Sequence, residues 1–275
     1  MPVSLRIPHM DLAQIAESGQ CFTWRALAPG RYAVAASGRR LECAQAGDSF
    51  TFSCTRGEWD AFWADYFDLG TDYGAIKAAI DPDDPCLTAA ARAGWGIRVL
   101  RQDFWEVAVS FLISQNNNIT RIKRSVTGLC AAYGRPIGPD AWSFPRPDDL
   151  AGVPEAAFQA LGLGYRAKYL AALAGRMARG GLEEFLAPLA GAEPEEARRA
   201  LLTLYGVGGK VADCILLFGL HRVDAFPVDT HIRRLLARHY PGGFPCGRYR
   251  GFLGILQQYL FYYDLKGPAG SVERV

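Results

Sequence analysis

A lysine that follows a glycine-rich turn is the side chain of this sequence best suited to chemistry. Lys210 comes directly after GVGG, residues 206–209, and opens an apolar run that we expect to be a helix through Phe218, ended by Gly219. Backbone amides of such a turn can approach a phosphate. A helix N-terminus and a desolvated pocket both favour a neutral amine, which is the nucleophilic form. The alternative is a lysine that binds phosphate or faces solvent, and the motif alone favours that alternative.

A carboxylate further along the chain makes the nucleophilic role of Lys210 more plausible. Asp229 follows Pro227-Val228 and precedes the helical pattern THIRRLLARHY, so its simplest role is to cap the N-terminus of that helix. A carboxylate that also faces the lysine could stabilise positive charge at a sugar C1′ and accept a proton during nucleophilic attack. Those are the electrostatic needs of glycosidic bond cleavage. The pair therefore suggests covalent chemistry on DNA.

The elements that must position this pair are mostly helical and follow a β-rich region. Between Phe22 and Cys54, β-favouring runs alternate with turn residues, which predicts an antiparallel meander. Helical spacing begins at Glu58, and the Pro- and Asp-rich stretch 81–85 breaks the chain. We predict an α+β protein with an N-terminal antiparallel β domain with helices, residues 1–85, and a helical body of two lobes around a cleft, residues 86–275. Helical patterns lie at 59–67, 73–80, 85–93, 103–114, 119–133, 155–162, 167–178, 195–206, 210–219, 230–240 and 250–265.

Composition narrows the class of protein. Half of the 275 residues are apolar, which is enough for one large core or a few smaller ones. No apolar run approaches the roughly 20 residues of a membrane-spanning helix, and the N-terminus lacks an export signal, so we expect a cytoplasmic protein with no membrane partner. The 7 cysteines are scattered without a CxxC pair, which predicts reduced thiols and no metal centre. The net charge of +2 is too small to indicate a nucleic-acid partner by itself.

Several blocks of the sequence resemble one family of DNA repair enzymes. The stretch around Lys210 resembles the helix–hairpin–helix element of base-excision DNA glycosylases, and GVGGKVADC with AFPVDTH is similar to their 8-oxoguanine DNA glycosylase branch. Similarity continues in SGQCFTWR, SQNNNITRI, LGLGYRAKYL and LQQYLFYYDL, so it runs from about residue 5 to residue 265. The resemblance implies an N-terminal sheet like that of the TATA-binding protein and helical HhH-GPD domains with a DNA-binding cleft, with hairpin and catalytic lysine within 200–219.

The resemblance implies a bifunctional mechanism on 8-oxoguanine opposite cytosine. Lys210 would displace the damaged base and form a Schiff base with the deoxyribose, after which β-elimination nicks the strand. Asp229 would be the catalytic aspartate. Because duplex DNA hides the reacting carbon, the nucleotide must first be flipped into a pocket.

Four residues are implied to recognise the flipped base. The carbonyl of Gly19 would accept a hydrogen bond from N7 of 8-oxoguanine, a donor that guanine lacks. Gln257 would read the Watson–Crick edge, Phe261 would stack on the base, and Cys214 would close its other face. Without the resemblance, Gly19 is a plain turn residue, Gln257 and Phe261 are helix surface or core, and Cys214 is a buried core cysteine.

A second set is implied to contact the opposite base and the DNA backbone, namely Asn116, Arg121, Tyr165, Arg166, Gly206, Gly208 and His231. The asparagine would fill the space left by the flipped base, the arginines would bind the orphan cytosine, and the tyrosine would wedge into the stack. The histidine and the glycines would approach phosphates. Taken singly, each arginine is more often a phosphate contact or solvent-facing.

The chain departs from the family pattern in the hairpin. Tyr205 stands where the family commonly has proline, and Gly209 replaces a bulkier residue, which predicts a looser turn. The hairpin carbonyls could hold a monovalent cation; otherwise we predict no cofactor.

Two rival functions stay open at this stage. One is a related glycosylase for another oxidised, formamidopyrimidine or alkylated base. The other is a non-catalytic helix–hairpin–helix DNA-binding protein. In each case the predicted partner is double-stranded DNA, containing a damaged base if the protein is a glycosylase. We expect a monomer, and the excess of Arg over Lys is compatible with a bacterial protein that associates with the nucleoid.

Overall fold

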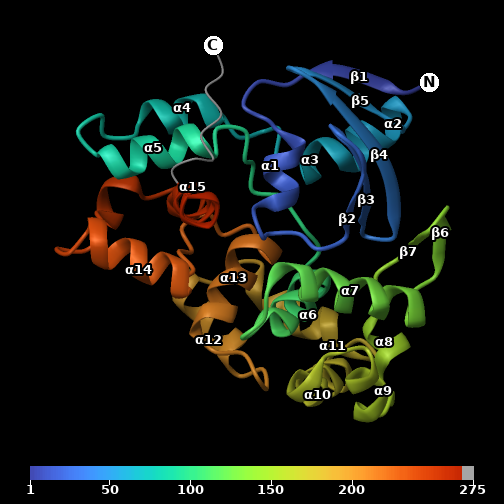
Figure 1. Cartoon of the computed structure of the whole chain (residues 1–275). Helices are drawn as coiled ribbons and strands as arrows, with labels where there is room; N and C mark the ends of the chain where they lie inside the picture. The colour runs from blue at the N-terminus through green and yellow to red at the C-terminus, as the bar shows by residue number, and fades with distance from the viewer. Residues whose placement is uncertain (268–275) are drawn as a thin grey trace.

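The N-terminal part of the chain is an antiparallel sheet of five strands in the order β1-β5-β4-β3-β2 (Figure 1). The computed structural model describes residues 1–267. Tight turns connect the last four strands in sequence, so the predicted meander is confirmed. The first strand, which the sequence analysis missed, is too short to show an alternating pattern, and it pairs with the last. The strands are β1 (Val3–Arg6), β2 (Trp24–Ala28), β3 (Arg31–Ala36), β4 (Arg39–Ala46) and β5 (Ser49–Phe52).

Short helical segments cover the buried face of this sheet. They are α1 (Leu12–Glu17), α2 (Arg56–Glu58), η1 (Trp59–Trp63) and α3 (Ala64–Tyr66). The predicted helix at 59–67 is therefore present, but its first part is a π-helix, and α1 was not predicted. Aromatic rings of Trp59, Trp63 and Phe67 pack with Phe50 and Phe52 of the sheet. This core holds the sheet as a unit beside the helical body.

The rest of the described chain is mainly helical, as predicted. Its helices are α4 (Tyr73–Ala78), α5 (Pro85–Ala93), α6 (Phe104–Ser114), α7 (Ile119–Tyr133), α8 (Pro147–Leu150), α9 (Glu155–Ala160), η2 (Gly164–Arg166), α10 (Ala167–Met177), α11 (Gly181–Leu186), η3 (Ala187–Leu189), α12 (Pro194–Leu202), α13 (Gly209–Gly219), α14 (Thr230–His239), η4 (Cys246–Tyr249) and α15 (Leu253–Lys266). The sequence analysis missed α8, α11, the short 3-10 turns and a small hairpin of β6 (Pro136–Gly138) and β7 (Ala141–Trp142). It also extended the helix at 195–206 into the turn that follows Leu202.

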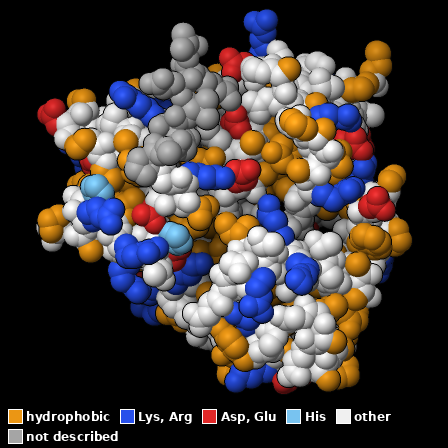
Figure 2. All heavy atoms as spheres, viewed as in Figure 1, with side chains coloured by type: hydrophobic (Ala, Val, Ile, Leu, Met, Phe, Trp, Pro, Cys, Tyr) orange, Lys and Arg blue, Asp and Glu red, His pale blue; other side chains and the backbone are white. Residues whose placement is uncertain are grey.

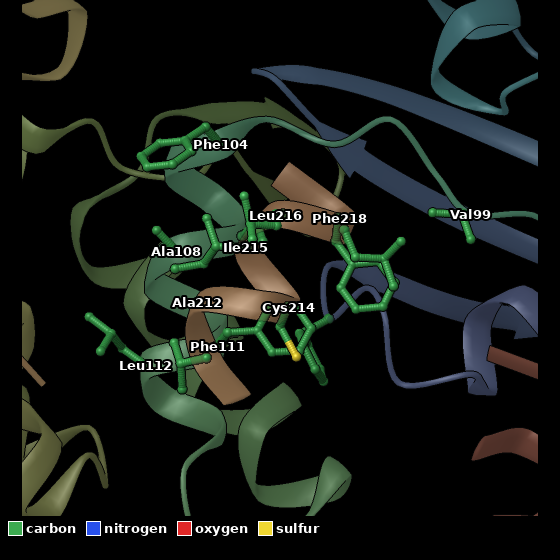
Figure 3. Packing of buried hydrophobic residues seen from close by; sticks show 14 of the residues in the cluster. Val99, Phe104, Ala108, Phe111, Leu112, Ala212, Cys214, Ile215, Leu216 and Phe218 are labelled. Carbon is green, nitrogen blue, oxygen red and sulfur yellow. The ribbon is translucent and has the colours of Figure 1, made fainter. Parts of the chain in front are cut away.

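Helix α6 forms the centre of the helical body because nearly all of its side chains are buried. It packs against α13, and Figure 3 shows Ala108, Phe111 and Leu112 facing residues of α13 such as Ala212 and Ile215. Close approach is possible because α13 ends in Gly219, where an added Cβ would lie 3.3 Å from the Cα of Phe104. The buried helix therefore fixes the position of α13, whose first turn carries Lys210.

The helices divide into two groups that flank this centre (Figure 1). Helices α4, α5, α14 and α15 lie on one side, and α7 to α11 lie on the other. The α+β fold class is confirmed. The domain boundary near residue 85 stays a prediction, and residues 268–275 of the predicted second domain lie outside the described part.

Candidate active site

A cavity of about 740 Å³ opens where these elements meet. Its wall comes from the loop between α6 and α7, the first turn of α13, the start of α14, the end of α15 and the turn before β2. It is larger than two other cavities, of about 520 and 490 Å³, which lie elsewhere. Figure 2 shows more Lys and Arg than Asp and Glu side chains over the face that carries α12 to α14. The cavity therefore opens toward a surface suited to a polyanion.

Lys210 projects into this cavity from the first turn of α13. Its Nζ lies 5.1 Å from the centroid of the Phe111 ring, and its amine lies near the thiol of Cys214 one turn later. Burial raises the pKa of the Cys214 thiol to about 11, so this thiol is protonated at neutral pH. In the described part of the chain, no carboxylate forms an ion pair with the amine. The lysine therefore has an aromatic and a neutral neighbour, not a charge partner.

Asp229 lines the same cavity and caps α14, as predicted. Its Oδ1 accepts a hydrogen bond of 2.8 Å from the backbone N–H of Ile232, and its own backbone is extended. Within the residues that the structure describes, the other carboxylate oxygen accepts no hydrogen bond. The sequence analysis left open whether one aspartate could be a cap and also face the lysine. The structure places both side chains on one cavity wall.

Gly19 and Phe261 come together from opposite ends of the chain to form another part of the wall. The backbone of Gly19 has φ = +73°, and an added Cβ would lie 3.1 Å from Cε1 of Phe261. Only glycine combines this conformation with such close contact. The Phe261 ring also meets the ring of His231 edge-on, with centroids 5.7 Å apart. The turn and the ring are therefore in contact and line one cavity; their role in base recognition stays a prediction.

Two of the predicted base-recognition residues do not line the open cavity. Cys214 and Gln257 are both buried, and the cavity wall does not include them. The amide of Gln257 donates a hydrogen bond of 3.0 Å to the carbonyl of Pro227, two residues before Asp229. Without the resemblance, the sequence allowed Gln257 to be either helix surface or core. The structure shows that it belongs to the core.

The predicted opposite-base residues form a connected loop structure. Asn116 has φ = +45° and donates a 3.2 Å hydrogen bond to the hydroxyl of the exposed Tyr165. Arg166 is only 6% exposed, so it is neither solvent-facing nor free for an outside phosphate, the roles that a single arginine most often has. Its guanidinium donates to the carbonyls of Gln115, Asn116 and Leu163. Four of its five N–H groups are used in this way within the described residues.

Arg121 and His231 stand at the edges of the site. Arg121 is exposed on the first turn of α7, and the cavity wall does not include it. His231 lines the cavity, and its Nδ1 lies 2.7 Å from a carboxylate oxygen of Asp264. Arg121 is therefore exposed and His231 partly exposed, and their contacts with DNA stay predictions.

The hairpin glycines have different environments. Gly208 lines the cavity, whereas Gly206 does not. The backbone of Gly206 has φ = +87°, and its carbonyl accepts a 3.1 Å hydrogen bond from the side chain of Gln115. The ring of Tyr169 covers Gly206 and meets the ring of Tyr205 edge-on, with centroids 5.1 Å apart. Aromatic packing thus braces the turn that lacks proline, and its expected looseness stays a prediction.

The sequence analysis missed three residues of this site. Phe111 gave no signal because it lies in a uniformly apolar helix, where every side chain reads as core. Asp264 lies far from His231 in sequence, so nothing local connects them. Gln115 could have been suspected, because it directly precedes the asparagine triplet.

The described residues offer no cluster of three or more His, Cys, Asp or Glu side chains that could hold a metal ion. All 7 cysteines are free thiols. Within residues 1–267, no helix is both long and apolar enough to cross a membrane. The prediction that no cofactor is needed stays a prediction.

Comparison with known proteins identifies the family. A family model for the N-terminal domain of 8-oxoguanine DNA glycosylase matches residues 3–107, and one for HhH-GPD superfamily base excision DNA repair proteins matches residues 109–243. The chain is 34% identical over 249 residues to the N-glycosylase/DNA lyase OGG1 of Arabidopsis thaliana, and the match covers 86% of this chain and 68% of that protein.

Two solved structures are similar over almost the whole chain. The structure of MBOgg1 in complex with a low-affinity DNA ligand has a TM-score of 0.89 at 36% identity, and the match covers 96% of each chain. The Clostridium acetobutylicum 8-oxoguanine glycosylase/lyase, in complex with double-stranded DNA containing cytosine opposite 8-oxoG, has a TM-score of 0.87 at 31% identity, covering 97% of this chain and 98% of that one. The chain belongs to the 8-oxoguanine DNA glycosylase family of the HhH-GPD superfamily.

Proposed function

We propose that this protein is a bifunctional DNA glycosylase and AP lyase that excises 8-oxoguanine opposite cytosine from duplex DNA. The observation that carries the proposal is one cavity that holds the amine of Lys210 and the carboxylate of Asp229, each at the start of a helix. The family relatives support it, since the Arabidopsis protein is an N-glycosylase/DNA lyase and the Clostridium complex contains this base pair.

In the proposed mechanism, Lys210 supplies the nucleophile. The neutral amine attacks C1′ of the flipped nucleotide, the glycosidic bond breaks, and the base leaves with the bonding electron pair and takes up a proton. Asp229 stabilises the positive charge that develops on the sugar. Ring opening gives a Schiff base at C1′, and loss of a C2′ proton then expels the 3′ phosphate. The Phe111 ring beneath the amine and the protonated Cys214 beside it keep the nucleophile in a partly apolar setting.

Base selection is assigned to the wall opposite the lysine. The Gly19 carbonyl accepts the N7 hydrogen that distinguishes 8-oxoguanine from guanine, and Phe261 stacks on the base. Cys214 and Gln257 lie deeper and contact the base once it is fully inserted. In support, Gly19 and Phe261 are in direct contact, so one inserted base could meet both.

The loop from Gln115 to Asn118 reads the opposite strand in this proposal. Asn116 fills the gap left by the flipped base, Tyr165 wedges into the stack, and Arg121 and Arg166 bind the orphan cytosine. His231, Gly206 and Gly208 approach the phosphates. The exposure of Asn116, Arg121 and Tyr165 supports these roles.

Further properties belong to the same proposal. We assign a monomer that requires no cofactor, with a monovalent cation at the hairpin carbonyls as an option, acting at the nucleoid of a bacterial cytoplasm. The domain boundary near residue 85 belongs here as well. A related glycosylase for another base is the second candidate, because the model that matches residues 109–243 describes HhH-GPD base excision DNA repair proteins in general.

Borohydride trapping tests the proposal. The wild-type protein is incubated with a labelled duplex carrying one 8-oxoguanine opposite cytosine, and borohydride reduces any Schiff base to a stable adduct. We expect an adduct with wild type and none with Lys210→Gln. Lys168→Gln is the control, because Lys168 is an exposed lysine that the cavity wall does not include. An adduct that persists in Lys210→Gln would refute the mechanism, and binding without any adduct would favour a non-catalytic DNA-binding protein.

A further inference from the structure

Helix α15 carries a second glutamine, Gln258, with an unusual hydrogen-bonding state. Gln258 is 3% exposed. Its Nε2 donates a 3.1 Å hydrogen bond to Oε1 of Gln257, while its own Oε1 is buried and has no hydrogen-bond partner among residues 1–267. A buried unpaired acceptor destabilises a fold by roughly 1–3 kcal/mol. A leucine or methionine here would remove this unpaired acceptor but would leave Oε1 of the buried Gln257 without its donor, so the two amides are coupled through one hydrogen bond.

The hydrogen bond from Gln258 determines how Gln257 is oriented. The two ends of a glutamine amide have the same shape and differ only in what they donate and accept. Gln257 donates to the carbonyl of Pro227 through Nε2 and accepts from Gln258 through Oε1. If the Gln257 amide were reversed, its Nε2 would face the Nε2 of Gln258, and its Oε1 would face the Pro227 carbonyl. Gln258 and Pro227 together therefore hold Gln257 in a single orientation.

The position of Gln258 on the helix connects it with the cavity. Residues three and seven positions later, Phe261 and Leu265, lie on the same helical face and line the cavity. Pro227 lies in the segment that leads to Asp229. The two glutamines thus lie between a cavity-lining helix face and the segment that carries the aspartate.

We propose that Gln258 is a positioning residue for base recognition, which holds the Gln257 amide in its reading orientation before the base enters. This inference rests on the proposed function. A guanine-type base presents hydrogen donors at N1 and N2 and an acceptor at O6, so a reversed amide would set donor against donor. An amide already fixed in one orientation loses less conformational entropy when the base binds. The unpaired acceptor of Gln258 is the cost of supplying that donor from a buried side chain.

The test separates base recognition from the rest of the reaction. A duplex with a preformed abasic site requires Lys210 and DNA binding but has no base to read, so AP lyase activity on it serves as the internal reference. Single-turnover excision of 8-oxoguanine opposite cytosine is measured beside it. Gln258→Met keeps an unbranched side chain of similar length and removes the donor. Tyr259→Phe is the matched control, because the Tyr259 hydroxyl is also buried on this helix and has no hydrogen-bond partner in the described part of the chain.

We expect Gln258→Met to slow excision about tenfold and to leave AP lyase activity unchanged, which is the effect of roughly one hydrogen bond. Tyr259→Phe should change neither rate. Unchanged excision in Gln258→Met, or an equal fall in excision and lyase rates, would overturn the inference. Failure of the proposed function looks different, because the wild-type protein would then leave 8-oxoguanine in place. In that case the same comparison is made with whichever base a lesion panel shows to be released.

Discussion

The two glycines that open and close the Gly206 to Gly208 turn should respond very differently to an added methyl group. In Gly206→Ala, the residue must keep φ near +87°, and its Cβ would lie 2.4 Å from the Tyr169 ring. That ring also meets the rings of Tyr165 and Tyr205, so it cannot move aside without disturbing both. In Gly208→Ala, φ is −94°, and apart from the adjoining backbone no atom of the described residues lies within 4 Å of the new methyl group.

The backbone conformation and the contacts of the two glycines set the loss of stability expected for each variant. A left-handed backbone conformation costs an alanine roughly 1–2 kcal/mol, and forced repacking costs about 1–3 kcal/mol. Gly206→Ala should therefore lower the free energy of unfolding by about 2–5 kcal/mol, which corresponds to a fall in melting temperature of roughly 5–15 °C for a chain of this size. Gly208→Ala changes only the helix cap residue, and we expect a loss below about 1 kcal/mol.

Thermal unfolding of the two variants and the wild type checks the stability difference, and binding to a duplex with an abasic-site analogue checks function. Gly208 lines the cavity, so its methyl group should weaken DNA binding while the fold stays intact. Equal melting temperatures for the two variants would show that the reasoning from φ and the Tyr169 contact is wrong. Full DNA affinity in Gly208→Ala would refute close phosphate approach at this glycine.

Three further predictions concern single side chains. In Asp229→Asn, the asparagine should still cap α14, so the melting temperature should stay within about 2 °C of wild type, while the loss of negative charge should slow excision at least about 100-fold. A large loss of stability beside the loss of activity would show that capping and charge stabilisation cannot be separated at this residue. Burial, with a smaller effect of Asp103, raises the pKa of Glu106 to about 8, so the stability from its protonated form is complete below pH 4.5 and is lost as the pH rises toward 8. The free energy of unfolding, measured in urea, should fall by up to about 1.4 kcal/mol per pH unit more in wild type than in Glu106→Gln across this window. If the free energies of the two proteins have the same pH dependence, the effect is excluded. Arg166→Met should cost about 2–4 kcal/mol in the same assay and reduce the preference for cytosine over adenine opposite the lesion, because buried carbonyls lose their donors; an unchanged preference would separate this arginine from opposite-base reading.

Local chemistry made much of the fold predictable. The meander followed from alternating runs between turn residues, and the long helices followed from their apolar spacing. The caps of α6, α7 and α14 were predictable because Asp103, Asn118 and Asp229 bond to backbone N–H groups only three residues later. Elements with too few residues to show a period, such as β1 and the β6 and β7 hairpin, could not be found in this way.

The sequence by itself determined the candidate lysine at its glycine turn, the capping aspartate and the order of the family motifs, because each depends on residue types within a few positions. Only the tertiary structure decided which of these residues share a cavity. Gly19 meets Phe261, and Lys210 lies over Phe111, through contacts between distant segments whose register is set by the packing of α6, α13 and α15. The burial of Arg166 and the orientation of Gln257 by Gln258 also depend on partners that no local pattern specifies, since a hydrogen bond in the core is made wherever the folded backbone places a donor beside an acceptor.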